Sequence, residues 1–281
     1  MRDAAANGQL ALLLEVTGTP KPGNVDRHRD HEDLRFEQFV AGAVGARPGL
    51  ELAADGARVG RAFERAVAGM SEQSGGNTQF GALLTVTPLV AAAATDRLSP
   101  AGAAAVVQAT SVEDACDFYR AFDHVDVAVD DPPPELDDLD VRRGGDATAA
   151  IRDREATLYD VMGLSADVDG VAAEWTGGFA RSFEAAGWLL ADDGPVYRRA
   201  SRAFLRLLAA EIDTFVVTRN GRAVAEEVRR RARAVCDGEA DAEADAEALA
   251  EELVDRGINP GTTADLTAAA LFVALERGLA V

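Results

Sequence analysis

Apolar side chains recur at intervals of three and four residues along almost the whole chain, and this period limits the possible folds more than any other feature. Leu10, Leu13 and Leu14 show it near the N-terminus, and Phe36 and Phe39 show it further along. Side chains at this spacing share one face of an α-helix. Helices are predicted over residues 4–17, 35–45, 57–72, 79–95, 100–109, 112–122, 148–162, 168–191, 195–217, 221–236, 240–256 and 262–278. The sequence therefore predicts an all-α fold.

Three stretches differ from this pattern. Residues 125–129 alternate between apolar and polar side chains, as a short strand would. Residues 130–146 are rich in Asp and Pro and end near a pair of glycines, which predicts an exposed loop. The acidic run at 239–247 fits the solvent-facing side of a helix better than a ligand site. Because polar motifs occur on both sides of the loop, we expect one globular multi-helix domain over residues 1–281.

Charge excludes one large class of partner. The formal net charge is −20, from 48 acidic and 28 basic residues, so a nucleic-acid partner is not expected. All but one of the basic residues are arginine, the exception being Lys21. Such an acidic, arginine-rich composition is typical of a halophilic protein, because concentrated salt screens the repulsion. A GC-rich genome that favours Arg and Ala codons is the alternative explanation, and the two are compatible.

Cysteine use and hydropathy indicate a cytoplasmic protein. Cys116 and Cys236 lack the spacing of a metal site, and two cysteines suit a reducing compartment. The N-terminal residues show no secretory pattern, and no run approaches the roughly 18 apolar residues of a membrane span. We expect no membrane partner, and the sequence leaves open whether the protein forms an oligomer.

The first polar motif follows the first predicted helix. Residues 20–26 read Pro-Lys-Pro-Gly-Asn-Val-Asp, and two prolines with a glycine predict a stiff, non-helical turn. In a chain that otherwise uses arginine, Lys21 suggests a compact ammonium that contacts a phosphate or carboxylate oxygen in a tight loop. The alternative is an exposed turn with an unimportant lysine. Two of the three histidines, His28 and His31, lie just beyond the turn.

The second motif, Gly-Gly-Asn-Thr at residues 75–78, precedes an apolar helix. Exposed backbone N–H groups at such a helix start can receive a phosphate, although an ordinary capped helix gives the same pattern.

The third and fourth motifs lie near the C-terminus. Glu211, Asp213, Thr214 and Arg219 fall within one predicted helix, where Asp213 either points into a site or lies at the surface. Residues 259–266 read Asn-Pro-Gly-Thr-Thr-Ala-Asp-Leu, which predicts a turn and a helix start with the spacing of a capping box.

The order of these motifs resembles that of the triphosphoribosyl-dephospho-CoA synthase family. The series is Glu-x4-Pro-Lys-Pro-Gly-x-Val-Asp, His-x-Asp, Gly-x-Asn-Thr-x-x-Gly, Asp-Thr-x4-Arg-x-Gly and Asn-Pro-Gly-x-x-Ala-Asp-Leu. It extends from about Leu12 to Val273, and its first and last motifs are the specific ones. The chain departs from the family at Gln79-Phe80, where better-known members carry His-Lys, and at 130–146, where they carry Arg-Gly-Glu.

The resemblance implies an all-helical transferase that joins ATP to 3′-dephospho-CoA and releases adenine, making the precursor of the prosthetic group of citrate and malonate lyases. ATP would be a substrate and Mg²⁺ a cofactor. The implied catalytic residues are Glu15, Lys21, His31 and Asp213. The implied nucleotide-binding residues are Gly23, Asn24, Asn77, Thr78, Arg219, Asn259 and Asp265. The implied magnesium ligands are Asp26, Asp33 and Asp213.

Displacement of adenine from ribose resembles glycoside cleavage. Its oxocarbenium-like transition state requires a carboxylate near the sugar, a proton donor for the base and an acceptor for the proton of the attacking hydroxyl. His31 is the expected proton donor.

Two other functions remain open. A related ribosyl transfer to another acceptor would also release adenine, so only the acceptor separates it from the first function. A non-catalytic nucleotide-binding protein would bind ATP without releasing the base. The lysine and the carboxylates favour an enzyme.

Overall fold

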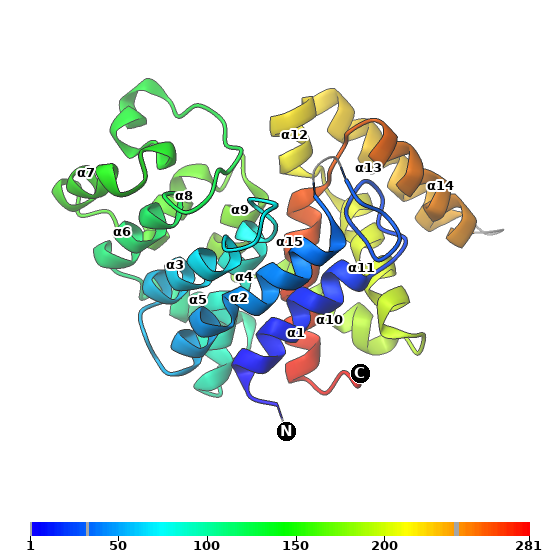
Figure 1. The fold of residues 1–281 in the computed structure, drawn as a ribbon, viewed down its shortest axis with the longest axis horizontal. Helices are drawn as coiled ribbons and strands as arrows, with labels where there is room; N and C mark the ends of the chain where they lie inside the picture. Colours follow the sequence, from blue (N-terminus) through cyan, green and yellow to red (C-terminus); the bar gives the residue numbers. More distant parts are fainter. Residues whose placement is uncertain (1, 32–33, 239–241) are drawn as a thin grey trace.

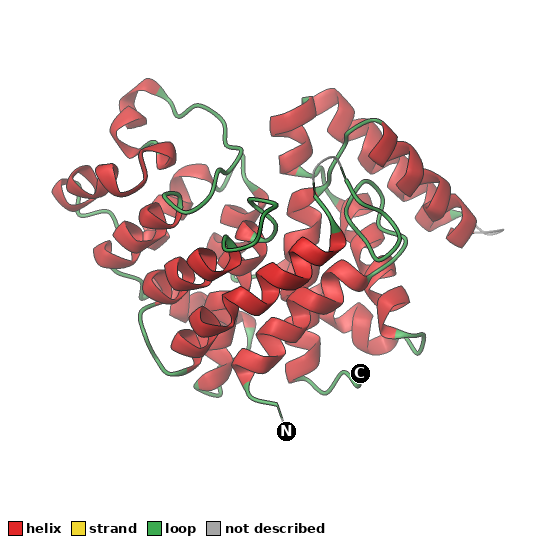
Figure 2. Cartoon of the chain, in the orientation of Figure 1, coloured by secondary structure: helices red, strands yellow, loops and turns green. Residues whose placement is uncertain are grey.

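Helices and connecting loops make up the structure, a computed structural model that describes residues 2–31, 34–238 and 242–281 (Figure 1). Figure 2 shows that these described residues contain no β-strand, which confirms the predicted all-α fold. The α-helices are α1 (Ala4–Thr17), α2 (Phe36–Ala54), α3 (Val59–Met70), α4 (Phe80–Ala94), α5 (Pro100–Gln108), α6 (Val112–Ala121), α7 (Thr148–Asp153), α8 (Leu158–Ser165), α9 (Gly170–Thr176), α10 (Ala180–Ala191), α11 (Val196–Ala210), α12 (Thr214–Asn220), α13 (Arg222–Asp237), α14 (Ala242–Asp255) and α15 (Gly261–Glu276).

For the middle of the chain, one expectation is wrong and another is met only in part. Residues 125–129 form an irregular connection and no strand. The expected loop at 130–146 contains two 3₁₀-helices, η1 (Pro134–Leu139) and η2 (Val141–Ala147). The hydroxyl of Tyr119 on α6 donates a hydrogen bond to the Leu139 carbonyl at 2.6 Å, which helps to explain why this acidic segment is ordered against the protein.

Three predicted helices are each divided in two. Residues 148–162 separate into α7 and α8, residues 168–191 into α9 and α10, and residues 195–217 into α11 and α12. Glu155 and Phe179 have positive φ angles of 52° and 60°, and Glu211 is extended, with φ −133° and ψ 161°. These backbone conformations end an α-helix. Because apolar periodicity continues across each break, it does not reveal them.

The helices α4 and α15 occupy the middle of the molecule (Figure 1). Every residue of α15 from Leu266 to Leu275 is buried, and α4 is similarly apolar on all sides. A helix that is apolar all round is typical of a core position. α15 packs against α1, α4, α10 and α11. Its first turn, which carries the last polar motif, is therefore surrounded by other helices.

A second hydrophobic cluster joins α11 to α12, α13 and α14. Phe204 and Leu208 of α11 pack there with Val228 and Leu253. Leu207 of the same helix belongs to the main core instead. Because α11 contributes to both clusters, the chain forms one domain.

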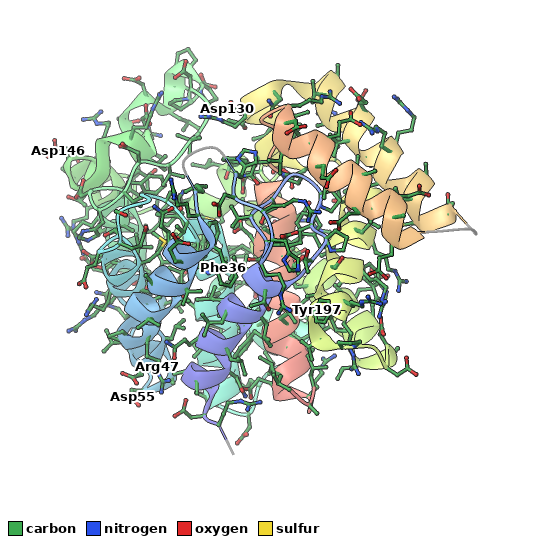
Figure 3. The ribbon with its side chains drawn as sticks, turned by 45° about the vertical axis from the view of Figure 1, so that its right-hand side comes forward. Phe36, Arg47, Asp55, Asp130, Asp146 and Tyr197 are labelled. Atoms are coloured by element: carbon green, nitrogen blue, oxygen red, sulfur yellow. The ribbon has the colours of Figure 1, made fainter. Side chains whose placement is uncertain are left out.

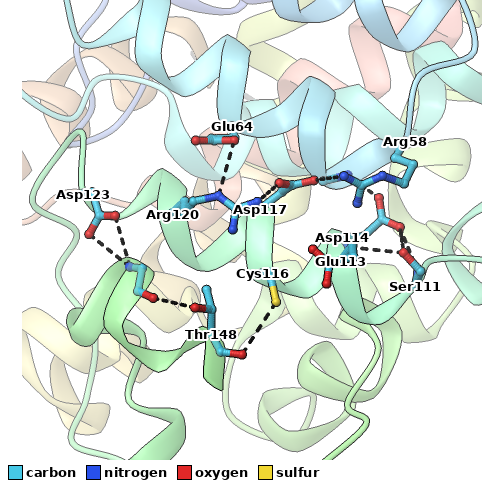
Figure 4. Close-up of polar contacts among 12 residues, drawn as sticks. Arg58, Glu64, Ser111, Glu113, Asp114, Cys116, Asp117, Arg120, Asp123 and Thr148 are labelled. Carbon is cyan, nitrogen blue, oxygen red and sulfur yellow. Dashed lines mark hydrogen bonds and ion pairs between the residues drawn. The ribbon is translucent and has the colours of Figure 1, made fainter. Parts of the chain in front are cut away.

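Polar contacts fasten the edge of the molecule around α6 (Figure 4). Ser111 and Asp114 form a capping box at its start, and Asp114 also accepts the backbone N–H of Gly60 at 2.8 Å. Asp117 pairs with Arg58 at 2.8 Å and with Arg120. These contacts fix α6 against α3. Among the described helices, none is both long enough and apolar enough to cross a membrane.

Candidate active site

The loop after α1 takes its shape from Asp26, which is fully buried. Its Oδ2 accepts hydrogen bonds from Thr19 Oγ1 at 2.9 Å, the Lys21 backbone N–H at 3.2 Å and the Arg29 guanidinium at 2.9 Å. Its Oδ1 accepts the backbone N–H groups of His28 at 2.8 Å and Arg29 at 3.0 Å. A metal ion at Asp26 would have to compete with these donors.

Lys21 does not lie on an exposed turn, because its side chain is completely buried. The ammonium forms an ion pair with Glu15 of α1 and donates a hydrogen bond to Asn24 Oδ1 at 2.8 Å. It also lies 5.8 Å from the centroid of the Phe204 ring. Burial raises the pKa of Glu15, and the nearby Lys21 charge opposes that shift. The lysine therefore contacts a carboxylate, which was one of the two predicted possibilities.

Tyr197 on α11 packs against the outer part of the loop (Figure 3). The Arg27 guanidinium carbon lies 4.7 Å from the centroid of the Tyr197 ring, close enough for a cation–π contact. Beside it, the hydroxyl of Ser201 donates to the Pro20 carbonyl at 2.6 Å. The loop is thus fixed to both α1 and α11.

The first and last motifs meet although they are far apart in sequence. Asn24 Nδ2 donates to Asn259 Oδ1 at 2.8 Å, across a separation of 235 residues. Gly23 lies beside them with a positive φ of 73°, and a Cβ there would come within 2.2 Å of the Ile258 carbonyl oxygen. Only glycine fits this position, because both the backbone angle and the close contact exclude a side chain.

Asp213 lies just before α12 and caps it, so the expectation that it falls inside a helix is wrong. Oδ1 accepts the Val216 backbone N–H at 3.0 Å. Oδ2 accepts both the backbone N–H and the hydroxyl of Thr263, each at 2.7 Å. The side chain is buried, which excludes the surface alternative, and burial raises the pKa of its carboxyl. Arg219 lies in the last turn of α12 and is exposed.

The predicted capping box at the start of α15 is absent. Thr262 Oγ1 instead lies 3.0 Å from Thr214 Oγ1 and accepts the Phe215 backbone N–H at 3.2 Å. Thr214 Oγ1 in turn accepts the backbone N–H of Gly170 at 3.0 Å. The threonines of two motifs thereby join the starts of α9, α12 and α15.

Asp265, four residues after the start of α15 at Gly261, lies among other carboxylates. A Cβ added at Gly81 would come within 2.1 Å of its Oδ2, so this glycine makes room for the acid beside α4. Burial raises the pKa of Asp265 well above its usual value, and the negative charges of Glu15, Asp213 and Asp169 add to the shift. The pKa of Asp169, which caps α9, is also raised by burial. Four acidic side chains therefore gather where α1, α9, α12 and α15 meet.

Asn77 and Thr78 lie at the start of α4. Asn77 Oδ1 accepts the backbone N–H of Phe80, the first residue of the helix, at 3.1 Å. Thr78 Oγ1 and Gln79 Oε1 are buried against Gly42 of α2 and form no hydrogen bond. The structure places this motif next to the carboxylates through Gly81.

His31 is buried, and its backbone exchanges hydrogen bonds with that of Leu34 at 2.9 and 3.0 Å. Asp33 lies outside the described residues.

Comparison with known proteins agrees with this arrangement. Residues 1–280 match the sequence model of the family described as ATP:dephospho-CoA triphosphoribosyl transferase (CitG). The chain belongs to this family. A crystal structure from Archaeoglobus fulgidus, provisionally named triphosphoribosyl-dephospho-CoA synthase, is similar to this transferase with a TM-score of 0.69 and 26% sequence identity. The similarity covers 86% of this chain and 100% of the other. No curated protein matches the chain. The predicted family, and with it an enzyme of the transferase class, is confirmed.

A magnesium site can be looked for only among the side chains that the structure describes. Across residues 2–31, 34–238 and 242–281, no group of three or more His, Cys, Asp or Glu side chains could hold a metal ion. Mg²⁺ commonly uses one or two carboxylates together with substrate phosphates.

Sequence reasoning missed Asp169, the fourth acidic residue of the candidate site. The sequence shows an Asp-Gly pair before an apolar segment. This pattern predicts that Asp169 caps a helix, but it does not predict a catalytic position. It joins the site through the Gly170–Thr214–Thr262 contacts, which no local pattern reveals.

Proposed function

We propose that the protein transfers the triphosphoribosyl group of ATP to 3′-dephospho-CoA, with release of adenine, at the meeting point of Glu15, Asp169, Asp213 and Asp265. One observation carries this assignment. The family motifs, which are scattered from α1 to α15, come together around these four carboxylates through the contacts of Asn24 with Asn259 and of Asp213 with Thr263.

The chemistry of the reaction matches such a cluster. The bond between the ribose carbon C1′ and adenine breaks, and a bond from C1′ to a hydroxyl oxygen of dephospho-CoA forms. The ribose becomes positively charged in the transition state, and buried carboxylates stabilise that charge strongly. The departing adenine takes up a proton, and the attacking hydroxyl gives one up to a carboxylate. In this proposal His31 remains the proton donor.

The triphosphate stays intact and requires positive charge. Lys21 is committed to Glu15 and Asn24, so we assign it to positioning Glu15 and not to a direct phosphate contact. Arg219 is exposed at the end of α12 and remains free for a phosphate. Asn77 and Thr78 at the start of α4 remain assigned to the nucleotide, and the buried Thr78 hydroxyl forms no hydrogen bond that would prevent this. Mg²⁺ held by Asp33 and Asp213 would supply further positive charge, and at Asp213 it would have to compete with the hydrogen bonds from Val216 and Thr263.

We also propose that the enzyme works in a cytoplasm with a high salt concentration. The charge of −20 with arginine in place of nearly all lysine supports an enzyme adapted to concentrated salt. Both cysteines are free, which supports a reducing cytoplasm.

The test is chromatographic measurement of adenine from ATP in concentrated potassium chloride with Mg²⁺, with and without 3′-dephospho-CoA. We expect adenine and a heavier CoA adduct only when dephospho-CoA is present, and no turnover after chelation of Mg²⁺. Asp213→Asn should remove turnover, while Asp255→Asn at the exposed end of α14 serves as the matched control. ATP binding without adenine release would contradict this acceptor.

A further inference from the structure

A small cavity lies beside Asp213, between the helices α10, α11 and α15. Its volume is ≈ 100 Å³. α10 contributes Arg181, Glu184 and Trp188, which share one face of that helix. The remaining lining residues are Leu207, Ala210, Glu211, Ile212, Asp213, Thr262, Thr263 and Leu266. The cavity therefore opens next to the residues that hold the carboxylate site together.

Its walls combine an aromatic ring with aliphatic side chains. Trp188 is half-buried, and the Arg206 guanidinium lies 4.1 Å from the centroid of its ring. Leu207 and Leu266, from α11 and α15, complete the apolar lining. Aromatic rings of this kind stack with nucleic-acid bases, whatever the base.

Most polar groups around the cavity already form hydrogen bonds within the protein. Few of them are therefore left to bind polar atoms of a ligand. Thr263 donates to Asp213, and Arg181 binds Glu174, Glu211 and the Gly170 carbonyl. Glu184 is exposed at the rim and is a hydrogen-bond acceptor. A ligand here should therefore present a flat apolar face and an N–H donor at its edge.

The cavity is large enough to hold part of a substrate but not a whole substrate molecule. Pockets for complete drug-sized ligands measure roughly 300–1,000 Å³. The space beside Asp213 is only about a third of the lower limit, enough for a ring system but too small for the ribose and phosphates as well.

We infer that this cavity binds an adenine ring, stacked on Trp188 with its exocyclic amino group toward Glu184. The inference rests on the proposed function, because both ATP and dephospho-CoA carry adenine. The ring comes either from the donor, where adenine is the leaving group, or from the acceptor, where it stays attached.

The test measures the affinities of ATP and of dephospho-CoA separately by calorimetry for the wild type and Trp188→Leu. The variant keeps an apolar side chain but loses the ring, and circular dichroism verifies its fold. Loss of stacking should weaken binding roughly 5- to 100-fold. Weaker ATP binding alone assigns the cavity to the leaving base, and weaker dephospho-CoA binding alone assigns it to the acceptor. Asp255→Asn, at the exposed end of α14, is the control and should bind as the wild type does.

A second measurement keeps the inference falsifiable if Trp188→Leu does not fold. Inosine nucleotides carry an oxygen in place of the adenine amino group, so the wild type should bind ITP about tenfold more weakly than ATP. Glu184→Ala should reduce that preference. Equal affinity for ATP and ITP, unchanged affinities in Trp188→Leu, or competition by pantetheine, which lacks adenine, would each overturn the adenine site. Adenine release is assayed in parallel, and its persistence in those cases would leave the proposed transferase activity standing.

Discussion

The carboxylates of this protein occupy two opposite environments. At the meeting point of α1, α12 and α15, burial raises the pKa values of Glu15, Asp213 and Asp265. Between α13 and α14, hydrogen bonds from arginine lower the pKa of Glu227 and bring that of Glu252 to about 2. The same residue types therefore respond in opposite directions, according to whether water and arginine can reach them.

The chain gives up stability at the carboxylate site and not at the surface of α13 and α14. Arg231 and Arg256 pair with both glutamates at the surface of α13 and α14. The carboxylate site holds acids close together, although the chain has arginine in abundance elsewhere. Such an arrangement destabilises the fold and is typical of a site maintained for chemistry.

The largest effect should follow the loss of Lys21, the cation buried with Glu15. Lys21→Met leaves the Glu15 carboxylate buried without its partner, and breaking a buried pair in this way costs about 3–5 kcal/mol. We expect a corresponding fall in the free energy of unfolding, measured by urea denaturation, and loss of adenine release.

The double variant Lys21→Met/Glu15→Gln separates the effect of the unpaired buried charge on stability from the effect of the substitutions on activity. It removes both charges, so it should recover most of the lost stability while staying inactive. A loss in Lys21→Met below about 1 kcal/mol, the level of an exposed pair, would show that the buried charge is not the decisive term.

Asp265→Asn should produce a smaller effect of the opposite sign on stability. The raised pKa means that the stability from this carboxyl is fully present below its unfolded pKa and is lost as pH rises through its folded pKa. At neutral pH the neutral amide should therefore stabilise the fold by about 0.5–2 kcal/mol, the usual range for relief of a strained site. The advantage should disappear in acid.

Turnover by the same variant should fall by about 100-fold or more, because an amide can neither carry negative charge nor take up a proton near the ribose. Urea denaturation across pH and adenine release provide the two measurements. If Asp265→Asn were less stable than the wild type at neutral pH, the carboxylate would be a structural acceptor and the contrast between the two regions would be wrong.

The sequence predicted correctly that residues of distant motifs lie close together. It did not predict the helix breaks and contacts that bring them there. The order of the motifs indicated that Asn24, Asn259, Asp213 and Asp265 belong together, and the structure brings them into one region. It did not reveal the helix breaks, because apolar spacing continues through Glu211 and the break depends on backbone angles. The contacts that recruit Asp169 and the Trp188 cavity arise from three-dimensional packing, which a linear pattern does not record.

The smallest effect should come from Glu252→Gln on α14. The Glu252 side chain is 43% exposed, and Arg256 binds it at 3.0 Å. Its pKa of about 2 means that the stability from the ion pairs is present above the unfolded pKa of 4.5 and is lost as pH falls toward 2. Glu252→Gln should therefore lower Tm slightly at neutral pH, with a difference that shrinks in acid and in concentrated salt.

Adenine release by Glu252→Gln should match that of the wild type, because the ion pairs of α13 and α14 stabilise the second hydrophobic cluster and do not contact the carboxylate site. Thermal denaturation at two pH values and two salt concentrations, together with the adenine assay, tests both halves of the comparison. A destabilisation as large as that of Lys21→Met would mean that the surface pairs contribute as much as the buried one. The exposure of Glu252 argues against this, because water already solvates much of its charge in the folded state.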